Sequence, residues 1–581
     1  MSILRAVSAC VEHATLRRLL QYQVVLAVTA AIEAINVLLV ASLVSYLLTG
    51  EMNIALSQVA EILNRFGLIS DPTRLTVEFV IYVALANILS AVLGVMNIFV
   101  LSHLAADAGR RLANRILKVF LSASSNGLLS IGPGSVTKLL TLEANRVTDY
   151  IFQNFAQVNA RIYTAIVIGG LLIYTSAAAF FISVALFLLT YLILMLIVRR
   201  RLGTFGTSIS QINAKRLKLL EEMTTGYKEI KSLSAEGYFD SSLSLEHAKY
   251  ARLYRNLNLI YNTPRFVIEL IIFICLMSLT AYSITTETQD ATGKMSEFLP
   301  IFGLAALKLL PIFQQLYSGY AQARAHSPAA KIISNFFAQF SLSSDKVELF
   351  REKDPVPFDR FDNEIDAISF EDLNFRYNGQ GEGFSFSFQI KRGAINFIVG
   401  PSGAGKTTLL EILSDLRAVD SGQLAIGKET FDLATTSMRT VCSYSAQRPF
   451  VVEGTVEENL TLGREVTQEA ITQAVDAAHL RDFLETLPNE LKTKIGSGIR
   501  ELSVGQLQRL GLARHLAAGR KILILDEPTS NLDQKTGDAV FASLRKIASE
   551  VFVVCVTHDT DRITNVDHVI RISAGKTKLD Y

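Results

Sequence analysis

One short segment constrains the fold of this chain more than any other feature, the run Gly400-Pro401-Ser402-Gly403-Ala404-Gly405-Lys406-Thr407. It matches the pattern G-x-x-x-x-G-K-[ST] of phosphate-binding loops at every fixed position. The apolar run 394–399 before it predicts a strand, and 408–413 after it predicts the first turns of a helix. Glycines in this context let backbone N–H groups turn toward phosphate oxygens, and the helix N-terminus adds the positive end of its dipole. The segment therefore predicts an α/β nucleotide-binding domain.

Lys406 and Thr407 supply the two functional groups that such a loop needs. We expect the Lys406 ammonium to compensate the charge of the β- and γ-phosphates of ATP, and the Thr407 hydroxyl to bind Mg²⁺. Thr408, the next residue, belongs to the same predicted phosphate site. A glycine-rich turn that binds nothing is the alternative, and the Lys-Thr pair with its flanking elements argues against it.

Two further predicted strands end in side chains suited to phosphate chemistry. The apolar run 522–525 ends in Asp526 and Glu527, and a strand end beside the loop is where a Mg²⁺-organising aspartate is needed. We expect Asp526 at the metal and Glu527 facing a water aligned on the γ-phosphate. The apolar run 551–557 ends in His558. Given the phosphate-binding loop, a γ-phosphate contact is favoured for this histidine over a purely structural role.

The first 325 residues differ sharply from the rest, because long apolar runs crowd them. The chain is 50% hydrophobic although 19% of its residues are charged. A helix needs about 20 residues to cross a bilayer, and a buried helical core of a soluble protein is the alternative for such runs. The large number of uninterrupted apolar segments disfavours this alternative. The six predicted spans are residues about 20–48, 76–101, 151–174, 177–198, 260–284 and 298–320.

Basic residues predict the orientation of these spans. They gather in the N-terminus, between spans two and three, and between spans four and five, whereas 50–74 and 287–294 are balanced or acidic. Both termini and both long basic segments are therefore expected in the cytoplasm, and a bacterial inner (cell) membrane is the expected location. The net charge of +2 does not suggest a nucleic-acid partner. The four scattered cysteines have no metal-binding spacing and are expected to be reduced thiols.

The two basic segments are each about 50 to 60 residues long and rich in helix-forming residues. An unstructured loop of that size would be unusual. We expect the spans to continue into the cytoplasm as long helices, each pair closed by a short turn. Further along, the charged, proline-broken run 351–357 predicts a linker. The expected domains are a transmembrane domain at 1–340, a linker at 341–365 and a nucleotide-binding domain at 366–581.

The run Leu502-Ser503-Val504-Gly505-Gln506 precedes a predicted helix. With it, nearly the whole chain resembles an ATP-binding cassette (ABC) transporter of the exporter type. The resemblance implies a six-span α-helical transmembrane domain fused to an α/β P-loop ABC ATPase domain, in a half transporter that works as a dimer. The family's signature is usually L-S-G-G-Q, so Val504 places a β-branched side chain where the family has glycine. Ser503, Gly505 and Gln506 are retained and are expected to contact ATP held by the opposite subunit.

Other positions match the family residue by residue. Tyr377 is similar to the aromatic residue that stacks on adenine. Gln447 resembles the glutamine that senses Mg²⁺ and couples to the membrane domain. Residues 530–533 resemble the loop that crosses the dimer interface, and 496–500 occupies the place of a short coupling loop but lacks the usual glutamate.

The resemblance implies ATP-hydrolysis-driven export or flipping of an amphiphilic substrate, such as a lipid, lipid-linked glycan, peptide or drug. An ATP-gated channel or regulatory sensor on the same frame is the main alternative, and the intact catalytic residues disfavour it. Import is disfavoured by the order of the fused domains. The expected partner is a second half transporter, with a homodimer favoured over a heterodimer, although Val504 leaves a heterodimer open. Membrane lipid surrounds the spans in either case.

Polar and ionisable residues inside the predicted spans are candidates for a substrate path, because a charge at mid-membrane costs roughly 3 kcal/mol or more. Glu33 lies near the middle of the first span, with Asn36 one turn on. Arg265 and Glu269 share one face of the fifth span at i, i+4, and Lys308 lies midway along the sixth. We expect these residues to line a central cavity. Interhelical pairs that only hold the bundle together are the open alternative.

Overall fold

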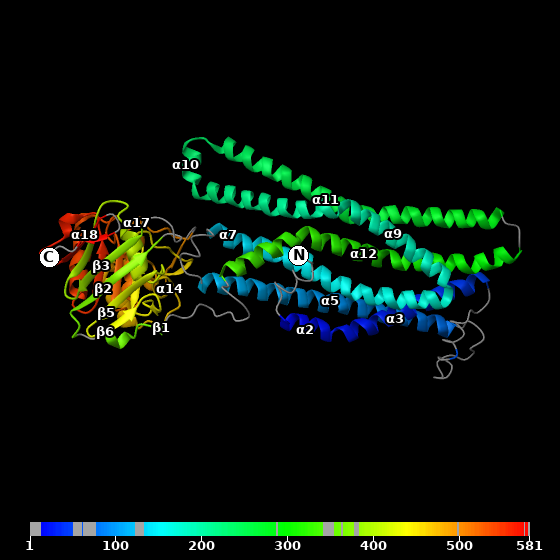
Figure 1. Ribbon diagram of the computed structural model, residues 1–581, viewed down its shortest axis with the longest axis horizontal. Coiled ribbons are helices and arrows are strands. Elements are labelled where there is room, and N and C mark those ends of the chain that lie inside the picture. The colour runs from blue at the N-terminus through cyan, green and yellow to red at the C-terminus, as the bar shows by residue number, and fades with distance from the viewer. Residues whose placement is uncertain are drawn as a thin grey trace. The chain divides into compact units, whose positions relative to one another are not determined.

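The computed structural model divides the chain into two compact units, one within residues 1–345 and the other consisting mainly of residues 346–581 (Figure 1). The structure describes residues 13–49, 61, 77–122, 133–285, 289–340, 354–361, 364–376, 383–496, 499–573 and 576–578.

The described residues of the first unit are helical (Figure 1). Long runs of Leu, Ala and Ile with few breakers favour this state, because these residues lose little conformational freedom in a helix or bury well. Its elements are α2 (His13–Gln21), α3 (Gln23–Thr49), α5 (Val77–Ser122), α7 (Pro133–Lys138), the π-helical turn η1 (Leu139–Glu143), α8 (Ala144–Val147), the π-helical turn η2 (Thr148–Phe152), α9 (Gln153–Thr225), α10 (Tyr227–Ser232), α11 (Glu236–Thr285) and α12 (Gln289–Phe340).

The 73-residue element α9 reverses direction along its length. Its residues Arg161 and Tyr191 make hydrogen bonds to adjacent residues of α12, Gln315 and Gln314 respectively. Thirty residues of straight helix would separate them by about 45 Å. Figure 1 accordingly draws α9 as two limbs that run in opposite directions. The sequence predicts two spans here, 151–174 and 177–198, and the structure joins them within one continuous helical element.

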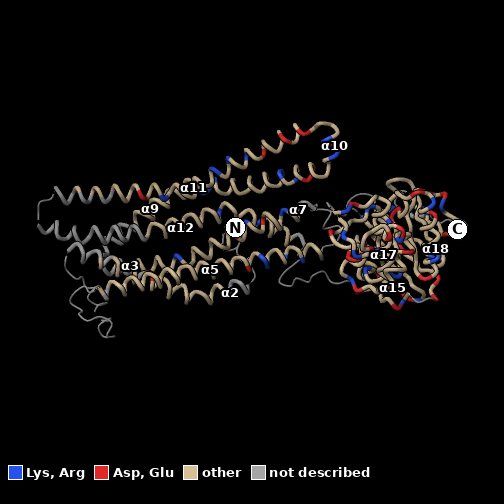
Figure 2. Tube along the Cα trace, turned by 180° about the vertical axis from the view of Figure 1, so that it is seen from behind, with Lys and Arg blue, Asp and Glu red and all other residues tan. Residues whose placement is uncertain are grey.

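Helices α9 and α11 extend well beyond the predicted fourth and fifth spans, so the prediction of long helical extensions is confirmed for this pair. They meet at α10, which follows Gly226 and buries none of its residues. Figure 2 shows acidic and basic residues gathered where α9 and α11 approach α10, and sparse along the described stretches farther away. The predicted turn of the other basic segment lies outside the described residues.

The first unit combines a closely packed α12 with apolar surfaces open to its surroundings. Ala321, Ala325 and Ala329 of α12 are fully buried, which lets neighbouring helices approach closely. In contrast, α5 exposes large apolar side chains such as Phe99, which is 70% exposed. Within the described residues, two helical stretches, Val80–Leu121 and Glu236–Ile274, are long and apolar enough to cross a membrane. The remaining predicted spans lie on α3, α9 and α12, where bilayer crossing stays a prediction.

The second unit is built on a ten-stranded sheet in the order β6-β5-β2-β3-β14-β13-β4-β12-β11-β8. The five adjacent strands β13, β4, β12, β11 and β8 run parallel to one another. The strands are β2 (Ala367–Phe375), β3 (Phe384–Lys391), β4 (Ile395–Val399), β5 (Ser421–Ile426), β6 (Glu429–Asp432), β8 (Cys442–Ser445), β11 (Ile522–Asp526), β12 (Phe552–Val556), β13 (His568–Ser573) and β14 (Lys576–Lys578).

Helices cover this sheet, and two short strand pairs flank it. The pairs are β1 (Asp354–Pro355) with β7 (Thr436–Ser437), and β9 (Gly454–Thr455) with β10 (Lys494–Ile495). The longer helices are α13 (Lys406–Leu413), α14 (Val456–Thr461), α15 (Gln468–Ala477), α17 (Val504–Leu516) and α18 (Gln534–Ile547), with the shorter α16 (Arg481–Glu485), η3 (Phe358–Arg360), η5 (Glu490–Lys492) and η6 (Thr560–Arg562).

The central strands β4, β11 and β12 are mostly apolar because both faces of the sheet are buried. Alternate residues of one strand enter different clusters: Ile524 of β11 packs in one cluster, while its neighbours Leu523 and Leu525 pack in the other. Cys555 of β12 and Cys442 of β8 are buried free thiols. The sequence predicts the strands 394–399 and 522–525 for this region, and both are confirmed within one residue.

The start of the second unit differs from the predicted linker at 341–365. Asp354 and Pro355 pair with Thr436 and Ser437 as a two-stranded parallel sheet. Val356 is 1% exposed and Phe361 is fully buried in the core. Residues 354–361 therefore belong to the folded unit, because their apolar side chains pack under the sheet. Proline and charge made this stretch resemble a linker in sequence.

Candidate active site

The phosphate-binding loop connects β4 to α13 as the sequence predicts. Gly403 and Gly405 adopt φ values of +79° and +96°, a left-handed region that glycine enters at little cost. A Cβ atom at Gly405 would lie 2.6 Å from the Phe384 ring, and one at Gly400 would collide with the Ile572 carbonyl oxygen. Glycine is therefore required at these positions, and the loop backbone stays close to the sheet edge.

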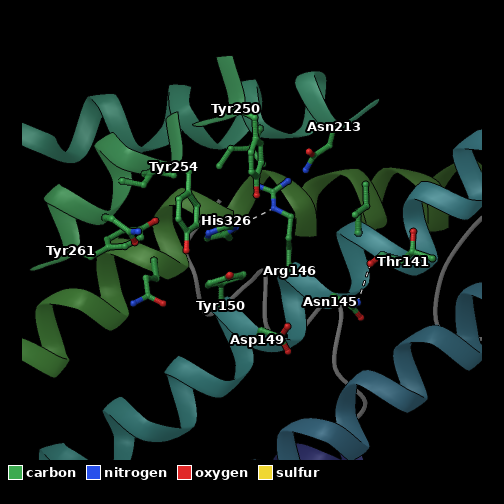
Figure 3. A pocket seen from close by; sticks show the side chains of 15 residues that line it. Thr141, Asn145, Arg146, Asp149, Tyr150, Asn213, Tyr250, Tyr254, Tyr261 and His326 are labelled. Carbon is green, nitrogen blue, oxygen red and sulfur yellow. Dashed lines mark hydrogen bonds between the residues drawn. The ribbon is translucent and has the colours of Figure 1, made fainter. Parts of the chain in front are cut away.

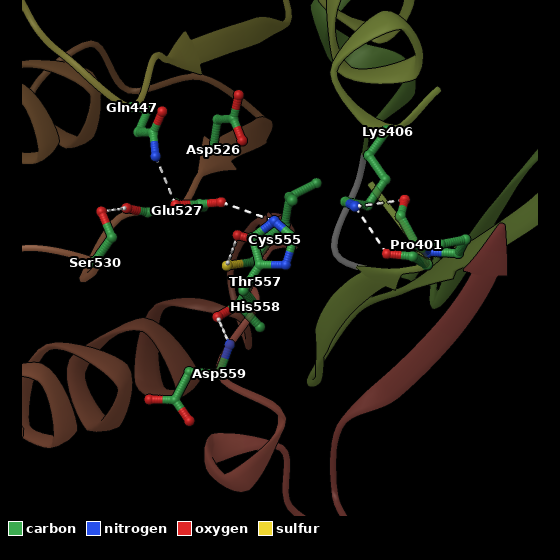
Figure 4. A network of polar contacts seen from close by, with 12 residues as sticks. Pro401, Lys406, Gln447, Asp526, Glu527, Ser530, Cys555, Thr557, His558 and Asp559 are labelled. Carbon is green, nitrogen blue, oxygen red and sulfur yellow. Dashed lines mark hydrogen bonds and ion pairs between the residues drawn. The ribbon is translucent and has the colours of Figure 1, made fainter. Parts of the chain in front are cut away.

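Lys406 lies at the first turn of α13, and its ammonium folds back over the loop. Its Nζ donates hydrogen bonds to the carbonyl oxygens of Gly400 (2.8 Å) and Pro401 (3.1 Å) (Figure 4). The residue is only 8% exposed and carries a charge that these neutral carbonyls do not compensate. An anionic phosphate fits this position, because it would supply the missing opposite charge.

The register of the parallel strands brings the predicted catalytic residues to one edge of the sheet. Asp526 of β11 pairs with Val556 of β12, and Val556 pairs with Ile398 of β4. Residues that follow these strands therefore emerge side by side at their carboxyl ends, which is where ligands bind in open α/β sheets. The loop after β4, the acidic pair after β11 and His558 after β12 meet at this edge.

Glu527 lies between two side chains that the sequence also singles out (Figure 4). Gln447 Nε2 donates to Glu527 Oε2 at 2.6 Å, and His558 Nε2 lies 3.2 Å from Glu527 Oε1. The backbone of Glu527 adopts φ +49°, which is uncommon for a residue with a side chain and often marks a functional position. Gln447 and His558 therefore orient the Glu527 carboxylate from both sides.

Asp526, the neighbour of Glu527, is partly buried. Burial raises its pKa above the ordinary range, and the charge of Glu527 raises this pKa further, while Lys406 opposes the shift. Its Oδ2 accepts a hydrogen bond from the Tyr444 hydroxyl at 3.3 Å. A bound cation would offset this destabilised negative charge, so the position suits a metal ligand.

The donor set around Asp526 fits Mg²⁺ better than a transition metal. Within the described residues, no group of three or more His, Cys, Asp or Glu side chains is arranged to hold a metal ion. Mg²⁺ keeps several waters and is bound through one or two carboxylates together with substrate phosphates. Asp526 and the Thr407 hydroxyl supply the protein part of such a site.

Two residues of this site were not predicted from the sequence. Tyr444 lies on β8, the strand next to β11, and no motif distinguishes it from a core tyrosine. Gln508 is 4% exposed; its Nε2 donates to the Glu527 carbonyl oxygen (2.6 Å) and to Ser530 Oγ (3.2 Å). Its Oε1 accepts from the Asn531 backbone N–H at 3.1 Å. It thereby ties α17 to the segment after Glu527, a link that only the fold reveals.

The predicted signature residues form the first turn of α17. Ser503 caps the helix: its Oγ accepts from the Gln506 N–H at 3.2 Å, and the Gln506 Oε1 accepts from the Ser503 N–H at 3.0 Å. Gly505 lies close to the next segment, because a Cβ there would be 3.1 Å from the Asn531 carbonyl oxygen. Val504 is 58% exposed, so its side chain points to the surface. Tyr377, the predicted adenine contact, lies outside the described residues.

Two of the candidate cavity residues of the first unit have polar partners on other helices. Glu33 Oε1 lies 3.8 Å from Arg161 Nη1, and Thr164 Oγ1 donates to Glu33 Oε2 at 3.4 Å. Asn36 is buried and donates to the Ala86 carbonyl oxygen at 2.8 Å.

The other candidates differ in how far the structure describes them. Arg265 and Glu269 form an exposed pair at 2.7 Å. The side chain of Lys308 lies outside the described part of the chain. Arg161, the partner of Glu33 on α9, was not predicted, although a basic residue inside an apolar run was a usable signal.

Two protein-family models match this chain. The model described as ABC transporter transmembrane region matches residues 37–324, and the model described as ABC transporter matches residues 384–530. Together they match parts of both units.

Two curated relatives match a little over a third of this chain each. A probable ABC transporter ATP-binding/permease protein of Haemophilus influenzae is 34% identical over 215 residues, or 37% of this chain and 39% of the relative. An ATP-dependent lipid A-core flippase of Desulfotalea psychrophila is 33% identical over 213 residues, or 36% of this chain and 37% of the relative. Both alignments thus span less than half of the relative's length.

A longer alignment and a solved structure extend the likeness to the first unit. A fatty acid ABC transporter ATP-binding/permease protein of Mycobacterium tuberculosis is 24% identical over 462 residues, or 76% of this chain and 68% of the relative. The ATP-bound structure of a bacterial Atm1-family ABC exporter superposes with a TM-score of 0.76 at 18% identity, and covers 97% of this chain and 95% of that chain. At this identity the superposition shows a shared fold.

Proposed function

The chain belongs to the ABC transporter family, and we propose that it uses ATP hydrolysis to export or flip an amphiphilic substrate across a membrane. The observation that carries this proposal is the placement of Glu527 between Gln447 and His558, at the sheet edge where the phosphate-binding loop also ends. A carboxylate held in this way can orient a water molecule and accept its proton. A protein that only binds nucleotide has no need of such a group.

In the proposed reaction a water oxygen bonds to the γ-phosphorus, and the bond from that phosphorus to the β–γ bridging oxygen breaks. The proton of the water goes to Glu527, and ADP carries the bridging oxygen away. Lys406 and the loop N–H groups hold the phosphates, while His558 lies near the transferred group. Thr407 and Asp526 would hold Mg²⁺, which compensates phosphate charge when bound.

We propose that two chains act together, each supplying the Ser503 to Gln506 turn to the ATP held by its partner. The first turn of α17 presents Gly505 and the exposed Val504 at the surface, as such a contact requires. Two copies of this chain are sufficient, because one chain carries a complete set of catalytic residues. The homodimer is therefore the simpler assembly.

The substrate class proposed here is an amphiphile. Two relatives bear the names lipid A-core flippase and fatty acid ABC transporter, and exposed apolar surfaces on α5 suit a protein that contacts lipid. The proposed arrangement is a multi-pass protein of a bacterial inner membrane with both termini in the cytoplasm, since basic residues flank the spans on that side.

Transport by reconstituted protein tests this function. The purified chain is placed in liposomes that contain fluorescent lipids, and ATP-dependent movement of lipid between leaflets is measured together with phosphate release. A parallel series of peptides and other amphiphiles tests stimulation of the ATPase. Transport that depends on ATP and is lost in Glu527→Gln supports the proposal. ATP-dependent ion conductance without substrate-stimulated turnover would instead support a channel on the same frame.

A further inference from the structure

The first unit contains a cavity of about 400 Å³ between α8 with its flanking π-helical turns, α9, α11 and α12 (Figure 3). We propose that this cavity binds a neutral, hydroxyl-rich headgroup such as a glycosyl group. Ligand pockets in proteins typically measure about 300 to 1,000 Å³, so the cavity is large enough for a small ligand. The proposal names a substrate class and rests on the proposed function for its role in transport, but binding itself requires no turnover.

The wall of the cavity is built from an unusual stretch of helix. The π-helical turns η1 and η2 lie on either side of α8, and the wall residues Asn145, Arg146, Asp149 and Tyr150 come from α8 and η2. A π-helical turn adds a residue to the helical repeat and is frequent at functional sites. Two such turns within 14 residues rotate these side chains together toward the cavity.

Arg146 fixes this wall to two other elements. Its Nη1 donates to Glu143 Oε2 at 2.8 Å and to Ser210 Oγ at 2.5 Å, and its Nε donates to His326 Nδ1 at 3.0 Å. Ser210 lies on α9 and His326 on α12. Because four helical elements are joined through one buried guanidinium, the cavity wall is held in place before any ligand binds.

Tyr261 supplies a polar group that lacks a partner. The residue lines the cavity and is 7% exposed, and its hydroxyl makes no hydrogen bond among the described residues. A buried hydroxyl without a partner costs about 1 to 3 kcal/mol. A hydroxylated ligand that reaches this group would remove the cost, so we assign the Tyr261 hydroxyl to hydrogen bonding with the ligand.

The remaining lining favours hydrogen bonding over charge. Tyr150, Tyr250 and Tyr254 accompany Tyr261, and the two charged lining residues, Arg146 and Asp149, have opposite signs. His326 is neutral at physiological pH, because burial and the nearby Arg146 lower its pKa to about 3. The amides that add donors and acceptors are Asn145, Asn213, Asn258 and Gln322.

An organic cation fits this cavity less well, because two aromatic faces are already covered. The ring of Tyr150 stacks on His326 at a centroid distance of 3.9 Å, and the Arg216 guanidinium lies 4.7 Å from the centroid of the Tyr250 ring. An aromatic cage for a quaternary ammonium needs open ring faces. Sugars combine stacking on a remaining ring face with many neutral hydrogen bonds, which this lining offers.

The position of the cavity suits a lipid headgroup. Tyr150 and Tyr261 lie at the predicted cytoplasmic ends of spans three and five, and Gln322 lies just beyond span six. These ends fall at the level of the inner-leaflet headgroups. A glycosyl group could therefore reach the cavity either on a lipid or as a free sugar, and the two sources share the same recognition chemistry.

Tyrosine fluorescence tests the proposal directly, because the chain has no Trp. The purified chain is placed in phosphatidylcholine nanodiscs without nucleotide, and the emission is followed as diglucosyl diacylglycerol is added to the lipid. Separate arms use free maltose, phosphatidic acid and inorganic phosphate. We expect a saturable response to the glycolipid, to maltose, or to both. A response to the glycolipid alone identifies the lipid-borne source, and an equal response to maltose identifies the free sugar.

Tyr261→Phe is the decisive variant, and Tyr238→Phe is its control, an exposed tyrosine near the start of the same helix that does not line the cavity. Tyr261→Phe should weaken sugar binding about tenfold, as one lost hydrogen bond predicts, without lowering the thermal midpoint. Tyr238→Phe should leave affinity unchanged. Glu527→Gln should bind the sugar normally, which separates this proposal from the ATPase assignment. Three results would overturn the proposed sugar site. They are unchanged sugar affinity in Tyr261→Phe, no response to either sugar, and a response only to the phosphate-bearing probes.

Discussion

Glu527 in the second unit and Glu33 in the first are both carboxylates with two polar neighbours. The neighbours of Glu527 are Gln447 and His558, at 2.6 and 3.2 Å. The neighbours of Glu33 are Thr164 and Arg161, at 3.4 and 3.8 Å. Sequence motifs predict both partners of Glu527 and neither partner of Glu33, although all four lie far from their glutamate along the chain.

The difference follows from how each unit brings residues together. In a parallel sheet the carboxyl ends of neighbouring strands meet at one edge, so a strand-ending motif predicts both position and neighbours. In a helical bundle the neighbours of a residue depend on helix rotation and crossing angle, which composition does not specify. The contacts of Glu527 are suited to chemistry, while the buried contacts of Arg146 in the first unit hold helices together. The four predictions below test this division.

Glu527→Gln should give the largest effect, a loss of about a hundredfold or more in turnover, as removal of a general base typically does. The amide keeps the shape of the side chain but cannot accept the proton of the attacking water. ATP affinity and the thermal midpoint should remain near those of the unmodified protein. Phosphate release under steady state measures the effect, with Glu501→Gln, an exposed glutamate near the start of α17, as control. Turnover within twofold of the unmodified rate would remove Glu527 from its assigned role.

The sequence also predicts more of the candidate site in the second unit than of the contacts in the first. The loop at 400–407 and the strand ends at Asp526 and His558 follow from local pattern, and the sheet register then explains why they meet. The partners of Arg146 could not be predicted, because His326 lies 180 residues away and Ser210 lies 64 away. The reversal of α9 was predicted only as a short gap between two spans. Gln508 was missed because its contacts exist only once α17 packs beside the segment that follows β11.

Glu143→Gln should give the next largest effect, on stability. Glu143 is 1% exposed and accepts from Arg146 at 2.8 Å, so the substitution leaves the Arg146 charge buried without its carboxylate. Removing one partner of a buried ion pair costs about 3 to 5 kcal/mol. Thermal unfolding of the purified chain in detergent should show a clearly lowered midpoint. Glu222→Gln, which breaks an exposed pair with Lys218, is the matched control and should change the midpoint little. Equal midpoints for the two variants would contradict the comparison.

Lys406→Ala should lower nucleotide affinity by about 10- to 100-fold, since a hydrogen bond to a charged group contributes about 1.5 to 3 kcal/mol. The lost ammonium leaves the phosphate charge less compensated, and binding rather than the chemical step should suffer first. Equilibrium binding of a fluorescent ATP analogue measures this affinity. Lys391→Ala, at the end of β3, serves as control. Equal affinity for Lys406→Ala and the unmodified chain would contradict the assignment of the phosphate-binding loop.

The smallest effect is expected for Glu33→Gln, and it bears most directly on whether the first unit also does chemistry. The Glu33 and Arg161 side chains are 35% and 38% exposed and lie 3.8 Å apart. A partly exposed pair at this distance contributes at most about 1 kcal/mol, so the midpoint should hardly move. Arg161→Met completes the set and should behave in the same way.

The informative quantity is then the response of the ATPase to substrate. Arg161 also donates to Gln315 of α12 at 2.8 Å, so the pair links α3 and α9 to α12 while it remains accessible. An accessible, weakly stabilising pair inside a predicted span is better explained by contact with a polar part of the substrate than by packing alone. Altered stimulation in Glu33→Gln, with basal turnover and midpoint unchanged, would support that contact. A lowered thermal midpoint with normal stimulation would instead show that the pair only stabilises the helical bundle. The residues that act on a substrate would then not include Glu33 and Arg161.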